Sequence, residues 1–315
     1  MADGACVPGR QARSSDPSRT LPSALSFTDA LPPLLALCSA VLFALSIQLS
    51  NLGLRDIDST TGVLIQISMT TTMYWLLAPW FVESAYWFTG AALVFAAVGL
   101  VRPALSANLA LAGVRYLGPT LASTLTSTSP FFGVAFGVLL LGELLTWPIA
   151  LGTLAVVAGT MLLTRPDSRQ AAWPLWAVAL PLGAAFIRAG GHGLTKFGFA
   201  EVPSPFFAAL VGHSVSFVVT ASAAAWRGGV KRRPLTSYGT LCFVAAGVIN
   251  GVSLLCLNTA LHLGEVVAVV PIVSASPMIT LLLGVLVFKR ERFTARGLLA
   301  MAVIIPGVMG IAFFR

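Results

Sequence analysis

The chain has 315 residues, of which 57% are hydrophobic and only 10% are charged, and its mean hydropathy is +0.89. A soluble domain carries about 25% charged residues, so this composition excludes a soluble protein and indicates an integral membrane protein. The net charge of +8 does not indicate a nucleic-acid partner. Most of the basic residues lie in short loops between apolar runs, where they are expected to set membrane orientation and contact anionic lipids.

Residues 1–30 are polar and rich in Ser, Pro and Arg, so we expect a disordered N-terminal tail. After this tail, ten apolar segments are long enough to cross a bilayer core of about 30 Å, which needs about 20 helical residues. These segments are 32–54, 61–82, 87–116, 119–142, 147–164, 172–197, 205–226, 237–262, 265–288 and 294–314. The sequence therefore predicts an all-α integral membrane protein with ten transmembrane helices.

The second half of the chain repeats landmarks of the first half. The Leu-Gly pair at 117–118, the Ser-Pro pair at 129–130 and Glu143 recur at 263–264, 276–277 and Glu291. A period near half the chain length indicates two repeats, which we place at 31–165 and 171–315. Because each repeat holds five expected helices, an odd number, the second repeat is predicted to lie inverted in the membrane relative to the first.

These landmarks resemble the EamA domain of the drug/metabolite transporter superfamily. In the first copy the resemblance is carried by Gly118, Pro119, Ala122, Ser129, Pro130, Gly142 and Glu143. The second copy keeps Leu263, Gly264, Ser276, Pro277 and Glu291, but has Lys289-Arg290 where the first has Leu-Gly. The resemblance covers roughly residues 32–314 and implies a ten-helix fold that transports a small solute. It does not imply which solute, because the shared motif concerns packing and turns.

Two arginines are predicted at membrane depth, where an ionisable side chain costs about 2.5–3.5 kcal/mol on insertion scales. Arg102 lies near the middle of segment 87–116, and Arg188 lies well inside segment 172–197. His192 and Lys196 follow Arg188 at i+4 and i+8, which places all three on one helix face. No Asp or Glu is expected near the membrane centre. Either the arginines form a positive cavity for an anionic solute, or they bind backbone carbonyls exposed at proline kinks.

Neutral polar side chains extend the candidate substrate-binding set, which is Arg102, Arg188, His192, Gln48 and Asn250. In the alignment of the two repeats, Asn250 lies at a depth similar to that of Arg102. Each amide can serve equally as an interhelical hydrogen bond. His192 is the candidate for any proton coupling, because an imidazole titrates near neutral pH.

The leading functional prediction is a secondary-active transporter of a small metabolite, such as an amino acid or organic acid, that works by alternating access. The alternative is a proton-coupled multidrug exporter, which would need a membrane carboxylate. An intramembrane enzyme is disfavoured, because no nucleophile with a base, carboxylate pair or metal-ligand motif is visible.

We expect no catalytic activity, no cofactor and no metal. No Walker motif is present, so ATP is not expected to drive transport directly. The four cysteines, at positions 6, 38, 242 and 256, show no ligand spacing and are interpreted as small hydrophobic residues. The expected partners are a small-molecule solute and the lipid bilayer, without nucleic acid, and the oligomeric state stays open. The expected location is the plasma or inner membrane, as a multi-pass protein.

Overall fold

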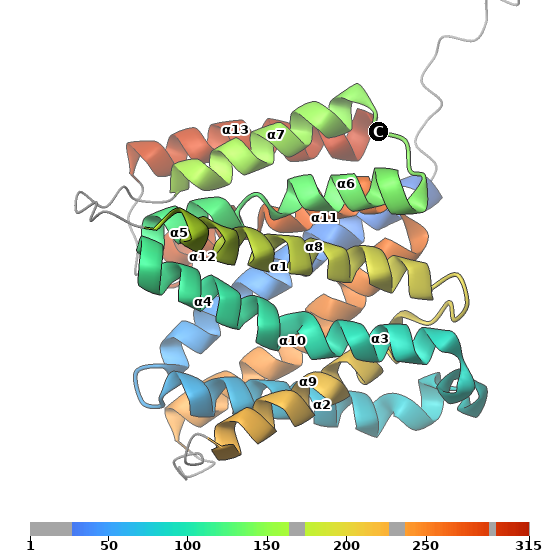
Figure 1. Ribbon diagram of the computed structural model, residues 1–315. Coiled ribbons are helices and arrows are strands. Elements are labelled where there is room, and N and C mark those ends of the chain that lie inside the picture. The colour runs from blue at the N-terminus through green and yellow to red at the C-terminus, as the bar shows by residue number, and fades with distance from the viewer. Residues whose placement is uncertain (1–26, 164–173, 227–236, 290–293, 315) are drawn as a thin grey trace, which may run out of the picture.

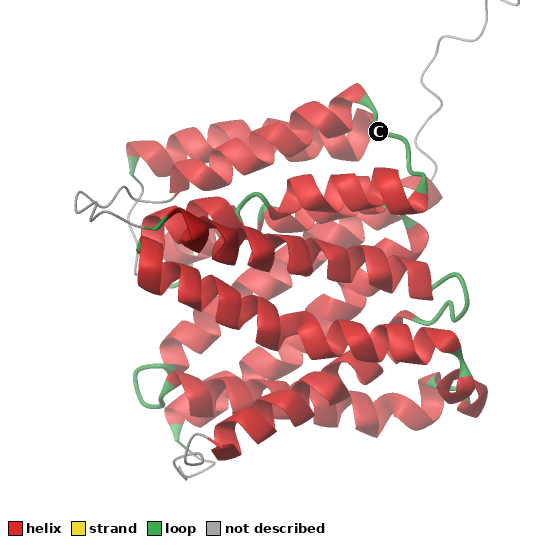
Figure 2. Ribbon diagram, in the orientation of Figure 1, coloured by secondary structure: helices red, strands yellow, loops and turns green. Residues whose placement is uncertain are grey.

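The computed structural model describes residues 27–163, 174–226, 237–289 and 294–314, and all regular structure in these ranges is helical (Figures 1 and 2). The predicted tail falls almost entirely outside the described residues. The helices are α1 (Phe27–Gly53), α2 (Ser59–Phe81), η1 (Ser84–Phe88), α3 (Gly90–Leu100), η2 (Val101–Leu105), α4 (Ser106–Leu117), α5 (Pro119–Thr126), α6 (Ser129–Leu141), α7 (Trp147–Leu163), η3 (Leu175–Val178), α8 (Ala179–Gly198), α9 (Pro205–Trp226), α10 (Tyr238–Leu263), α11 (Val266–Ser274), α12 (Ser276–Leu286) and α13 (Ala295–Phe314).

Six segments of the described chain are long and apolar enough to cross a membrane. They are Ala30–Gly53, Leu121–Leu141, Pro205–Trp226, Tyr238–Leu263, Val266–Leu286 and Ala295–Phe313. Gly90–Leu100 and Trp147–Leu163 are apolar but shorter. The six segments correspond to six of the ten predicted spans, so the count of ten remains a prediction.

The helix ends follow local sequence signals. Asp58 caps α2 by accepting a hydrogen bond of 3.1 Å from the amide of Thr61, as an N-cap aspartate is expected to do. Gly118 has a φ of 80°, ends α4 and is followed directly by the first residue of α5. This confirms the predicted break at Gly118-Pro119, because a positive φ favours glycine and proline suits the first turn of a helix.

The expected span 87–116 is interrupted at its centre. Arg102 has φ −125° and ψ 132° inside the wide turn η2, which separates α3 from α4. A residue before proline is disfavoured in the α region, and proline has no N–H to donate to the carbonyl four residues earlier. The hydroxyl of Ser216 on α9 replaces that donor, since its oxygen lies 2.9 Å from the carbonyl oxygen of Gly99 and 2.7 Å from that of Arg102.

Replacing Ser216 with alanine should therefore destabilise the protein by about 1–3 kcal/mol, because it leaves a buried carbonyl without a donor. The measurement is thermal or denaturant unfolding of the purified protein in detergent. Ser214→Ala is the matched control on the same helix, since the Ser214 hydroxyl bonds an exposed tryptophan, Trp75. Equal stability losses in the two variants would show that Ser216 does not support the interrupted helix.

The centre of the bundle is built by close helix contacts. Helices α1 and α10 lie side by side (Figure 1), with the hydroxyl oxygens of Ser39 and Ser253 3.2 Å apart. Helix α2 packs on the same helix α10, where Thr70 and Tyr74 donate hydrogen bonds to the carbonyls of Gly247 and Gly251. The glycines at 247 and 251 allow this close approach. In lipid no hydrophobic force drives helices together, so close packing and hydrogen bonds between helices must hold them.

Candidate functional site: a basic cluster inside the bundle

Helix α8 presents two different faces. Phe186, Leu194 and Phe197 are exposed and lie on one side of the helix, where they are suited to contact lipid. His192 and Thr195 are buried on the other side. Arg188 shares that inner side, one turn before His192, as the predicted spacing requires. Arg188 lies near enough to His192 for its charge to act on the imidazole, and their shared role in a binding site stays a prediction.

The structure brings Arg102 and His192 together from helices that are 90 residues apart in the sequence. The Nη1 atom of Arg102 lies 3.3 Å from Nδ1 of His192. A guanidinium can only donate hydrogen bonds, so this contact holds His192 in the neutral form with Nδ1 as the acceptor. Gly191 makes the approach feasible, because a Cβ atom at that position would overlap Cδ of Arg102.

Arg188 is exposed even though it lies on the inner side of α8. Its neighbours on the same face of α8, His192 and Thr195, are buried. The charges of Arg102 and Arg188 are close enough to repel each other, and both act on His192. Within the described part of the chain, Arg188 has neither a hydrogen bond nor an ion pair. The basic cluster formed by Arg102, Arg188 and His192 thus has excess positive charge.

Lys196, the third residue predicted on this face of the helix, has a different role from Arg188 and His192. Its Nζ atom donates hydrogen bonds to the carbonyl of Gly264 at 2.8 Å and that of His262 at 3.3 Å. These carbonyls lie at the end of α10, where a cation satisfies free acceptors and the negative end of the helix dipole. Lys196 therefore ties α8 to the end of α10 and makes no hydrogen bond to the basic cluster among the described residues.

Two glutamates, Glu143 and Glu201, accept hydrogen bonds from helix N-termini at this end of the bundle. Gly142, with a φ of 67°, terminates α6 and allows Glu143 to accept hydrogen bonds of 2.9 Å from the amides of Val266 and Val267 at the start of α11. From the sequence, Glu143 was identified only as a repeat landmark. The contacts show that Glu143 joins the first predicted repeat to the second.

Glu201 makes the reciprocal connection. It follows α8 in the second predicted repeat and accepts hydrogen bonds from the amides of Gly90 and Ala91, which begin α3 in the first repeat. The oxygen–nitrogen distances are 2.9 and 2.6 Å. Carboxylates at helix N-termini are favourable because free amides and the helix dipole both attract them. We call Glu143, Lys196 and Glu201 together the end clamp.

The two amide candidates lie apart from these contacts. The side chain of Gln48 is only 3% exposed and its Nε2 donates a hydrogen bond of 2.8 Å to the carbonyl of Thr280 on α12. This contact favours the structural alternative for Gln48, an interhelical hydrogen bond. Asn250 is half-buried in α10. Among the contacts of the described residues, neither amide is joined to the basic cluster, so their role in binding remains a prediction.

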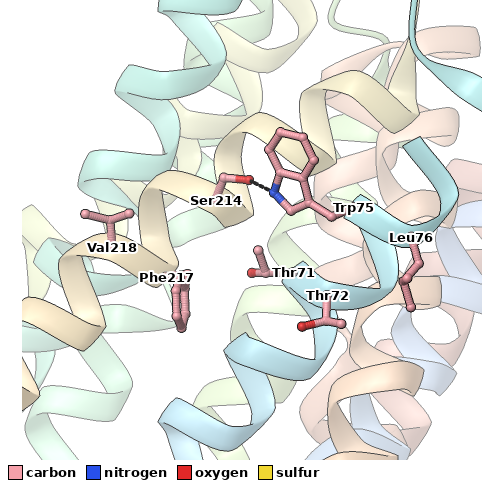
Figure 3. Close-up of a pocket in the computed structure, with 7 residues that line it drawn as sticks. All are labelled: Thr71, Thr72, Trp75, Leu76, Ser214, Phe217 and Val218. Atoms are coloured by element: carbon pink, nitrogen blue, oxygen red, sulfur yellow. Dashed lines mark hydrogen bonds between the residues drawn. The ribbon is translucent and has the colours of Figure 1, made fainter. Parts of the chain in front are cut away.

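A separate groove lies between α2 and α9 (Figure 3), with a volume of about 560 Å³. Across it the indole nitrogen of Trp75 donates a hydrogen bond of 3.0 Å to Ser214. Its lining residues are Thr71, Thr72, Trp75, Leu76, Ser214, Phe217 and Val218. Leu76 and Val218 are well exposed, so the groove belongs to the outer apolar surface and not to the basic cluster.

Residues 31–165 and 175–313 each match the model of the EamA-like transporter family. The chain belongs to this family. Membership identifies the EamA-like protein as a multi-pass membrane transporter of the drug/metabolite type, which acts on a small-molecule solute in a lipid bilayer and points away from an enzyme. The resemblance to the EamA domain is thereby confirmed, and so is the presence of two repeats.

Comparisons with individual proteins establish the fold of this EamA-like transporter and nothing finer. One solved structure, described only as a crystal structure of a protein, superposes with a TM-score of 0.75 at 16% sequence identity. The match covers 89% of this chain and 95% of the other. No curated protein matches the sequence.

Proposed function

We propose that this EamA-like transporter is a secondary-active carrier of a small anionic or carboxylate-bearing metabolite, such as an amino acid or organic acid. The solute binds at the basic cluster of Arg102, Arg188 and His192, and two inverted five-helix repeats, 31–165 and 171–315, rock around it by alternating access. The observation that carries the proposal is Arg188, an accessible guanidinium on the inner side of α8 without a protein partner.

The electrostatics of the cluster favour an anion. Two repelling guanidinium groups at membrane depth are costly, and a bound carboxylate relieves this cost by pairing with both. A guanidinium binds a carboxylate through two parallel hydrogen bonds in one plane. Because His192 already accepts from Arg102, it orients that guanidinium while leaving Arg188 available to the solute.

The end clamp supports alternating access by closing one end of the bundle. Arg188 lies ten residues before the end of α8, or about 15 Å from that end at 1.5 Å per residue. Glu143 and Glu201 tie α11 and α3 across the two repeats, and we propose that the solute enters from the opposite end. A transporter in this state takes up solute from one side of the membrane only.

A screen of solutes tests the proposed substrate class directly. Purified protein should be stabilised against thermal unfolding by particular carboxylate-bearing solutes, since a ligand that binds only the folded state contributes about 2.7 kcal/mol at 100 times its Kd. Amines of matched size are the control. Stabilisation by cationic drugs instead of anions would contradict the proposal and favour the multidrug exporter, and solutes that stabilise should then be tested for uptake into liposomes.

A further inference from the structure

Two cysteines that are 218 residues apart in the sequence meet between α1 and α10. The sulfur atoms of Cys38 and Cys256 lie 4.0 Å apart. Cys38 is exposed and Cys256 is half-buried, whereas Cys242 is buried elsewhere on α10. The sequence interpretation of these cysteines as isolated hydrophobic residues is incomplete for this pair, because only the packing of the two helices reveals it.

The helices that carry the thiol pair are held in a defined register. Ser39, next to Cys38, and Ser253, one turn before Cys256, join their hydroxyls at 3.2 Å. The hydroxyl of Ser253 also lies 2.8 Å from the backbone carbonyl of Ser39, and Ser46 bonds the carbonyl of Ala246 further along. Helix α1 belongs to the first matched repeat and α10 to the second. A ligand that bridges the two sulfurs therefore connects the two repeats.

The two sulfurs are in contact as free thiols, and only a small outward shift is needed for a metal ion to bridge them. A disulfide needs about 2.05 Å between sulfurs, whereas a linear sulfur–metal–sulfur bridge with bonds of roughly 2.3 Å needs about 4.6 Å. Zinc requires four ligands, and within the described residues no group of three or more His, Cys, Asp or Glu side chains gathers. Two thiolates suit a soft ion, because thiolates select soft metals, and one that is satisfied by two ligands.

We infer that Cys38 and Cys256 form a two-coordinate site for a soft divalent cation such as the mercuric ion, and that the bound ion links the two repeats. On binding, each thiol loses its proton to water and the metal forms two metal–sulfur bonds, without any change in oxidation state. Two protons leave as one divalent cation enters, so the filled site is neutral. Neutrality is important here, because a net charge on the membrane-facing surface would be costly.

The test uses mercuric chloride on purified full-length protein, with Cys6 replaced by Ser in every variant. After equimolar loading and washing with excess monothiol, the parent should retain about one mercury per chain. Cys38→Ser and Cys256→Ser should each retain at least about 10-fold less, because the second sulfur acts at high effective concentration. Cys242→Ser is the matched control and should behave as the parent does.

A thermal measurement on the same samples reports the link between the repeats. Mercury should raise the melting temperature of the parent and of Cys242→Ser, because a cross-link over a long loop restricts the unfolded chain. It should not raise that of either single-serine variant of the pair. Melting without mercury verifies that each variant folds, with Cys38→Ala and Cys256→Ala as replacements for any that does not. Equal mercury retention by parent and Cys38→Ser, or retention that requires Cys242, would overturn the inference.

Discussion

Replacing Arg188 with leucine is expected to weaken stabilisation by anionic solutes strongly while leaving the empty protein as stable as the parent, or slightly more so. Arg188 has no hydrogen bond or ion pair within the described chain, so its removal breaks no protein contact. It also relieves repulsion with Arg102 and the cost of a charge at membrane depth. The affinity for the solute should fall about 10- to 150-fold, the equivalent of a charged hydrogen bond of about 1.5–3 kcal/mol.

Arg102→Leu should reduce solute affinity similarly, but at some cost in stability, because it removes the donor to His192. Lysine at either position should recover little if the solute is held by both guanidinium nitrogens, since an ammonium cannot form the planar pair of bonds. Affinity and melting temperature are measured on the same preparation, by titrating the solute found in the thermal screen. This pairing separates a binding role from a structural role.

Arg115→Leu provides the matched control for the arginine experiment. Arg115 lies exposed in the last turn of α4, so the substitution makes the same change in charge and size outside the basic cluster. It should leave solute affinity unchanged. If Arg188→Leu instead lowers the melting temperature sharply while binding per folded molecule is retained, Arg188 supports the fold and the anion site is wrong.

Glu143→Ala is expected to loosen the closed end of the bundle. The carboxylate accepts hydrogen bonds from the amides of Val266 and Val267, and bonds to a charged group contribute about 1.5–3 kcal/mol each. Without it, these two amides should exchange their hydrogens with water roughly 10- to 100-fold faster, which hydrogen-exchange mass spectrometry can measure. Glu143→Gln should lie between, because its amide oxygen still accepts but the attraction to the helix dipole is lost.

Glu265→Gln is the control for the end clamp. Glu265 is exposed and occupies the N-cap position of the same helix, but its side chain makes no capping hydrogen bond. The Glu265→Gln substitution therefore removes the same charge near the same amides without removing a hydrogen bond. Exchange at Val266 and Val267 should stay at the parental rate. Equal exchange in Glu143→Ala and the parent would show that the clamp does not hold this end closed.

The sequence by itself determined the class of the protein and its two repeats, and it predicted a shared face for the basic residues of one segment. High hydropathy with few charges is possible only in a bilayer, and the recurring Leu-Gly, Ser-Pro and Glu landmarks identify the family. The spacing of Arg188 and His192 was also sufficient, because an α-helix places residues i and i+4 on one side whatever surrounds it. Local signals such as Gly118-Pro119 determined where helices end.

Only the tertiary structure decided which helices meet. In a membrane protein, lipid-facing and buried surfaces are both apolar, so hydropathy does not reveal which side of a helix packs against which neighbour. The contact of Arg102 with His192, the repair of the interrupted helix by Ser216 and the thiol pair all join residues that are 90 or more positions apart. The end clamp was hidden for a further reason: its partners are backbone amides and carbonyls, which every residue carries and no sequence motif marks.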